Sequence, residues 1–302
     1  VQTPAEGNFP VDHVIRVAPQ VAATKGSYTT DKLTEFDLLV EDSNSPASKY
    51  TYSNTVFKKG EGSWTPSKML LWSKSDAEVL VYAIAPSVGN ESLVSVDNIN
   101  DENKCPNLAV QAEQSKDDCS SDYLGWASGK KKVSELLTDG KLSFAFTHLL
   151  TRFTVTFKLG TEFNVSGVPA QDIISDVVVS GTARDFKLKS ATGYTSFTVT
   201  PGTAASDIKP YSVGWTSAEN AQGYCSSVYD CILVPQAVTK GGLKISFKAA
   251  GKNYEWVSAA DYTLNGNTAY TLTLKVGKDV VIAGGFTATA WEEGVGGLLY
   301  TE

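Results

Sequence analysis

Two histidines and four cysteines are the side chains of this sequence best suited to catalysis or metal binding. His13 and His148 lie among alternating apolar residues, and neither has a cysteine or serine nucleophile beside it. The cysteines do not have the Cys-x-x-Cys spacing of a zinc or redox site. We therefore interpret both histidines as structural. The sequence predicts no catalytic residue, no cofactor and no metal site, and so a protein that is not an enzyme.

The cysteines are instead candidates for disulfide bonds, because they occur as two close pairs. Cys105 and Cys119 bound a polar loop, and Cys225 and Cys231 flank five residues just before a predicted strand. In an oxidising compartment each pair would be bridged. A bridge that closes the 15-residue loop from Cys105 to Cys119 contributes about 3 kcal/mol in the chain-entropy model. The alternative is four reduced thiols that pack as small apolar residues.

Acidic and aromatic residues give weaker indications of a binding site. Asp117-Asp118 and Glu292-Glu293 lie in polar stretches typical of solvated charge, and residues 97–103 lack the glycine and final glutamate of a calcium loop. Exposed tryptophans could stack on sugar rings, which would make the protein a glycan-binding module. The candidates are Trp64, Trp126 and Trp215, and packing in the core is the alternative for each.

These residues would be positioned by β-strands, and the clearest strand signal lies between residues 142 and 159. Large apolar residues occupy even positions up to Phe146 and odd positions from Phe153 onward. Strict alternation is typical of a strand with one buried face. A change of parity needs an extra residue, so the sequence predicts a β-bulge or tight bend near His148–Thr151.

Other segments extend the same β pattern. Residues 79–86 form an apolar run that predicts a strand buried on both faces and ended by a proline. An early strand is predicted with Val11, Ile15, Val17 and Val21 on one face. Helical signal is confined to residues 133–137 and 170–175. The predicted fold class is all-β, with few short helices.

Length and charge narrow the class of protein. A chain of 302 residues favours two domains. Glycine and proline punctuate residues 160–169, which predicts a linker there and β-sandwich domains over residues 1–160 and 161–302. The net charge of −7 and the lack of a basic patch argue against nucleic acid as a partner. No apolar run approaches the ~20 residues of a membrane-spanning helix.

Six segments together resemble the fimbrillin family, the type V pilus subunits of Bacteroidetes. Their order and spacing agree with the family from about residue 11 to residue 302. The segments are Lys68–Trp72, Val81–Pro86, Phe146–Val155, Ile232–Gln236, Asn267–Leu274 and Phe286–Trp291.

The resemblance implies two tandem transthyretin-like β-sandwich domains in a structural pilus subunit at the cell surface. Such subunits are lipoproteins of the outer membrane that serve in cell adhesion. The implied partners are other pilus subunits, in a homo- or hetero-polymer, and a host or bacterial surface ligand. The lipid-bearing cysteine of such precursors is absent here, so contact with a membrane would come only through an N-terminal lipid outside this chain.

The resemblance also implies assembly by donor-strand exchange. An Arg- or Lys-specific protease would remove the first strand, His13–Val21, by cutting at Lys25; a cut at Arg16 would leave half of the strand behind. The C-terminal strand of another subunit would then fill the groove. Donor side chains would come from residues 284–300, namely Phe286, Ala288, Ala290, Leu298 and Tyr300.

Two alternatives remain open at this point. The last strand could be a fixed part of its own domain, as in a tip or accessory subunit that donates nothing. The protein could instead be a monomeric surface glycan-binding lipoprotein that uses exposed aromatic residues.

Overall fold

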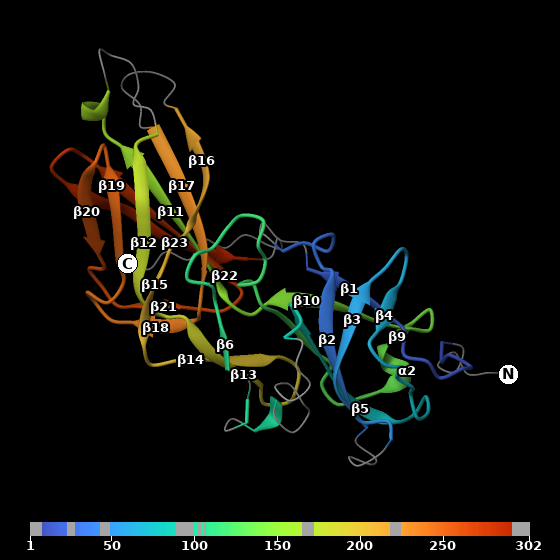
Figure 1. The fold of residues 1–302 in the computed structure, drawn as a ribbon. Helices are drawn as coiled ribbons and strands as arrows, with labels where there is room; N and C mark the ends of the chain where they lie inside the picture. Colours follow the sequence, from blue (N-terminus) through green and yellow to red (C-terminus); the bar gives the residue numbers. More distant parts are fainter. Residues whose placement is uncertain are drawn as a thin grey trace.

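The computed structural model describes residues 8–22, 28–42, 49–88, 99–101, 104–105, 107–164, 172–217 and 225–291. Within this part of the chain nearly all regular structure is β, which confirms the predicted fold class. Two bodies of sheet lie side by side, one from the first half of the chain and one from the second (Figure 1). None of the described helices is long and apolar enough to cross a membrane.

The first half forms a sheet that has nine strands among the described residues. The main path through this sheet runs β1-β10-β7-β5-β2-β3-β4, while β8 pairs with β5 and β9 pairs with β10. The strands are β1 (Val17–Val21), β2 (Glu35–Asp42), β3 (Tyr52–Lys59), β4 (Trp64–Pro66), β5 (Glu78–Ala85), β7 (Leu124–Ala127), β8 (Lys131–Lys132), β9 (Leu137–Thr138) and β10 (Lys141–His148). The short helix α2 (Val133–Leu136) lies where the sequence predicts it.

The second half forms a sandwich of two sheets. The five-stranded sheet has the order β16-β17-β11-β22-β23 and the four-stranded sheet the order β15-β12-β19-β20. Phe157 and Phe247 pack between them, with ring centroids 4.6 Å apart. The strands are β11 (Thr151–Leu159), β12 (Ile174–Ala183), β15 (Ala205–Ile208), β16 (Tyr211–Thr216), β17 (Cys225–Leu233), β19 (Lys244–Ala249), β20 (Lys252–Val257), β22 (Thr268–Val276) and β23 (Val281–Ala290).

Two smaller sheets complete the fold. One is β14-β13-β6, from β6 (Asn107–Ala109), β13 (Asp185–Ser190) and β14 (Phe197–Pro201). The other pairs β18 (Gln236–Val238) with β21 (Tyr262–Leu264). A 3₁₀ turn, Thr161–Phe163, follows β11. The helix predicted over residues 170–175 is wrong where it can be compared, because Ile174 and Ser175 begin β12 and pair with β19.

Strand β5 is buried on both faces, as its sequence predicts. Its even residues, such as Tyr82, join the core cluster that also fills the second-half sandwich, and its odd residues, such as Val81, join a separate cluster under β1 and β10. Tyr82 packs against Phe197 of β14, so a strand from the second half covers the back of the first sheet. Apolar residues therefore suit every position of the strand from Val79 to Ala85.

The parity change near residue 150 is the point where the chain passes from one body of sheet to the other. Strand β10 ends at His148 and β11 begins at Thr151, which confirms the predicted bend. Strand β11 pairs with β17 and β22 over its whole length. The sheets therefore divide at Leu149-Leu150, and the boundary expected after residue 160 does not coincide with this division (Figure 1).

Gly181 in β12 provides a test of how closely β12 packs against the backbone at Gly242. Its φ is +94°, and a Cβ built there would lie 1.8 Å from the carbonyl oxygen of Gly242. Gly181→Ala should therefore cost about 2–5 kcal/mol of unfolding free energy. The loss would come from backbone strain and from forced separation of the backbone at Gly181 from that at Gly242. Urea denaturation measures this loss.

Gly241→Ala is the matched control. Its φ is +82°, but a Cβ there would meet nothing within 4 Å, so only strain of about 1–2 kcal/mol remains. Equal losses for the two variants would contradict the close approach of Gly181 to Gly242.

Candidate functional site

The predicted first strand is an edge strand of the first sheet. β1 pairs in parallel with β10, from Val17 opposite Leu142 to Val21 opposite Phe146. Two backbone hydrogen bonds flank this pairing. Leu142 N–H donates to the Arg16 carbonyl, 2.8 Å, and Ala22 N–H donates to the Phe146 carbonyl, 3.0 Å. No other strand pairs with β1 among the described residues, so backbone pairing holds it on one side only.

Three of the four side chains predicted to face the core do so. Ile15, Val17 and Val21 are buried in the cluster under β1 and β10. Val11 is 99% exposed, and its predicted place on the buried face is wrong. The chain turns between Pro10 and His13, where His13 N–H donates to the Pro10 carbonyl and His13 has a φ of +60°. This turn breaks the alternation that the sequence suggests from residue 11 onward.

The segment before β1 is tied to its surroundings. His13 bonds through Nδ1 to the Trp72 carbonyl, 3.0 Å, so it is structural as predicted. Arg16 is exposed and pairs with Asp12, whose pKa its hydrogen bond helps lower to about 2. Ile15 N–H donates to the Leu70 carbonyl. The backbone around Arg16 is therefore bonded within the sheet, whereas Lys25 lies outside the described residues.

The predicted donor segment begins in β23, which pairs antiparallel with β22 from Val281 to Ala290. Phe286 is half-buried and packs against Tyr262 and Tyr270, with centroids 4.4 Å and 5.5 Å apart. Ala288 is half-buried and Ala290 is exposed. In this structure they belong to their own sheet. Leu298, Tyr300 and Glu292-Glu293 lie outside the described residues.

Trp291 anchors the end of β23 against the place where the chain changes sheet. Its indole is buried, and its ring stacks on that of His148 with centroids 4.0 Å apart. His148 Nδ1 lies 2.7 Å from the carboxylate of Asp122, and all three side chains are shielded from solvent. The structural role predicted for His148 fits this contact, while its partners Asp122 and Trp291 were not foreseen. No sequence spacing links these three positions.

The family of the protein is shown by comparison with known sequences. The sequence pattern of the fimbrillin-like family matches residues 22–291. The chain belongs to the fimbrillin-like family. The match begins at the residue after β1 and ends at Trp291. None of the curated proteins gives a significant match to the sequence.

Solved structures share the fold of this fimbrillin-like chain. A candidate cell adhesion protein from Bacteroides uniformis aligns over 93% of this chain and 100% of its own, with a TM-score of 0.61 and 15% identity. A fimbrial protein from Bacteroides vulgatus covers 92% and 99%, with a TM-score of 0.54 and 13% identity. The C-terminally truncated tip fimbrial protein Mfa3 from Porphyromonas gingivalis covers 91% and 99%, with a TM-score of 0.53 and 12% identity.

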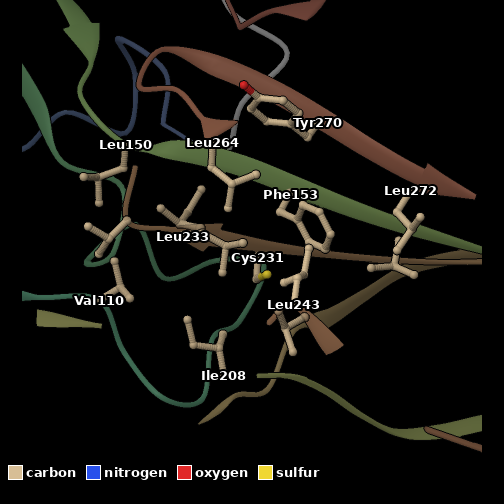
Figure 2. Packing of buried hydrophobic residues seen from close by; sticks show 14 of the residues in the cluster. Val110, Leu150, Phe153, Ile208, Cys231, Leu233, Leu243, Leu264, Tyr270 and Leu272 are labelled. Atoms are coloured by element: carbon tan, nitrogen blue, oxygen red, sulfur yellow. The ribbon is translucent and has the colours of Figure 1, made fainter. Parts of the chain in front are cut away.

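None of the four cysteines forms a disulfide bond in the structure, which corrects the predicted disulfide bonds. Cys225 and Cys231 begin and nearly end the same strand, β17. At about 3.3 Å per residue their Cα atoms are roughly 20 Å apart, far beyond the ~7 Å limit of a disulfide. Cys231 points into the core among leucine side chains, and burial raises its pKa well above the usual value (Figure 2).

The other cysteine pair is also unbridged. The Cys105 thiol donates to the Asp101 carbonyl, 3.1 Å, while Cys119 is half-buried against the cluster under β1 and β10. Burial raises the pKa of the Cys119 thiol. The thiols therefore act as small apolar residues, the alternative that the sequence left open.

The tryptophans considered for sugar stacking are all half-buried in the fimbrillin-like fold. Trp126 stacks on Phe144 at 4.6 Å, and Trp215 packs against the second-half core. Trp64 contacts Phe36 edge-on but also lines a surface groove. No group of residues in the described part of the chain is arranged to hold a metal ion.

The Trp291 anchor gives a prediction for the end of β23. Trp291→Ala removes a buried indole and should lower the free energy of unfolding by about 3–5 kcal/mol. Ile282→Ala within β23 changes a residue that is 55% exposed, and should stay within about 0.5 kcal/mol of the parent protein. Urea denaturation of both variants measures the difference, and a Trp291→Ala loss no larger than that of the control would contradict the anchor.

Proposed function

We propose that this protein is a structural subunit of a cell-surface pilus that serves in adhesion and assembles by donor-strand exchange. Membership of the fimbrillin-like family supports the pilus assignment. Proteins with this fold include a fimbrial protein and a tip fimbrial protein. The single observation that carries the assembly step is β1, an edge strand with a buried apolar face that is paired on one side only.

Removing residues 1–25, which include β1, would leave a strong acceptor site. Ile15, Val17 and Val21 would each uncover a buried pocket. At about 1.5–3 kcal/mol per side chain the three amount to roughly 4.5–9 kcal/mol, which is comparable with the ~5–15 kcal/mol stability of a whole domain. The free edge of β10 would add backbone hydrogen bonds for an incoming strand.

The donor we propose is the segment after Trp291 rather than β23 itself. β23 is paired with β22 from Val281 to Ala290 apart from a register shift at Gly284, and Trp291 holds its end in the core. Residues 292–302 follow this anchor and carry Leu298 and Tyr300 at alternate positions. Their two side chains would enter neighbouring pockets on one face of the groove. Glycine residues 294, 296 and 297 would give this segment the freedom to reach another subunit.

Processing is proposed at Lys25, on the C-terminal side of β1. A cut there would release the whole strand, whereas the backbone at Arg16 is bonded to Leu142 and is a poor protease substrate. The partners are other copies of this chain or other pilus subunits. The proposed location is the outer surface of the cell, with attachment to the outer membrane through a lipid outside this sequence.

A trypsin titration at low dose tests the proposal. Intact mass and light scattering should report loss of residues 1–25 together with a ladder of multimers. Lys25→Gln should prevent both, and Arg16→Gln should prevent neither. A chain that ends at residue 291 should accept a donor but give none, so that adding it to the parent protein shortens the ladder.

Two results would contradict the proposal. A cut after Lys25 that leaves a monomer would exclude exchange between copies of this chain. Multimers that form equally well from the chain ending at residue 291 would exclude the donor segment.

A further inference from the structure

A groove of about 370 Å³ runs between β1 and the turn that joins β3 to β4. Three separate segments of the chain build it: the start of β1, the turn, and the start of β10. The lining residues are Arg16, Val17, Ala18, Lys59, Gly60, Gly62, Ser63, Trp64 and Lys141.

The groove concentrates positive charge on an acidic protein. Arg16, Lys59 and Lys141 contribute three cations, and no lining residue is acidic, although the whole chain carries a net charge of −7. Lys59 and Lys141 take part in no ion pair within the described part of the chain; Lys59 Nζ donates only to the Thr30 carbonyl, 3.3 Å. Arg16 is paired with Asp12, which lies outside the groove. Two ammonium groups are therefore available to an anion.

Trp64 gives the groove an aromatic wall. Phe36 supports the indole edge-on at 5.0 Å, so packing fixes the orientation of the ring. The adjoining turn is closed by a bond from Gly60 N–H to the Ser63 carbonyl, 2.8 Å. Gly62 has a φ of +76°, and a Cβ there would meet nothing within 4 Å. The missing side chains leave the backbone of this wall open to a ligand.

The free side of β1 is poorly suited to an added peptide strand. Residues 16 and 22 bond to β10, so odd-numbered residues face away from it. On that side Ile15 N–H is taken by Leu70, Val21 N–H is taken by Thr30, and Pro19 has no N–H. A strand docking here would find one free donor, that of Val17, which is too few for a β-ladder.

We propose that this groove binds an acidic saccharide, a sugar chain that carries carboxylate or sulfate groups. The indole of Trp64 would pack against the face of a sugar ring, and the ammonium groups of Lys59 and Lys141 would bind its anions. Neutral sugars would lack the ionic contacts, and acidic peptides would lack the stacking contact. Because Arg16–Ala18 form one wall, the untrimmed protein is the binding form.

Calorimetric titration of the full, untrimmed chain with a chondroitin sulfate tetrasaccharide tests this site. Binding should weaken as salt rises and should quench tryptophan fluorescence, and neutral chitotetraose should not bind. The double variant Lys59→Gln/Lys141→Gln should lose affinity by about tenfold or more, because two charge-assisted hydrogen bonds are removed. Lys58→Gln is the matched control: Lys58 is exposed and lies opposite Glu35, outside the groove, and its loss should change affinity less than about twofold.

Three outcomes would overturn the proposal: no binding by the untrimmed protein, equal losses for the Lys58 control and the double variant, or equal binding of a glutamate octapeptide. The last would assign the groove to acidic peptides. The experiment contains no protease and no assembly step, so its failure is separate from failure of the proposed strand exchange.

Discussion

The fold depends on one continuous segment, residues 141–159, that supplies a strand to each body of sheet. β10 lies between β1 and β7, and β11 lies between β17 and β22. The two residues between them, Leu149 and Leu150, change which face of the chain is buried. β10 therefore turns its phenylalanines into the cluster under β1 and β10. β11 turns its own into the core cluster that fills the second-half sandwich. A shift of one residue in either strand would expose one of these apolar faces.

Both segments of the proposed assembly step are tied to this central element. β1 pairs with β10, so its removal exposes the edge of a strand that the rest of the fold holds rigidly. At the other end, Trp291 stacks on His148, the last residue of β10. The anchor fixes where β23 stops and so fixes where a donor segment begins. The proposed acceptor edge and the residue that precedes the proposed donor segment therefore both contact β10.

Sequence reasoning succeeded where a local period decided the structure. The parity change at residues 148–151, the doubly buried β5 and the short α2 were all predicted correctly, because each follows from side-chain alternation or a local signal. It failed where partners distant in sequence decide. Val11 has the right parity, yet a turn at His13 removes it from the strand. Cys225 and Cys231 are close in sequence but roughly 20 Å apart once extended. The Asp122–His148–Trp291 contact joins residues with no shared spacing.

Hydrogen exchange of β10 tests the central claim most directly. Amides of residues 141–148 should be protected in the intact protein, lose protection once residues 1–25 are removed from a chain ending at residue 291, and regain it when a synthetic peptide of residues 292–302 is added. Protection that survives removal of β1 would contradict the role of β1 as the cover of the acceptor site beside β10. Protection that the peptide fails to restore would contradict the proposed donor.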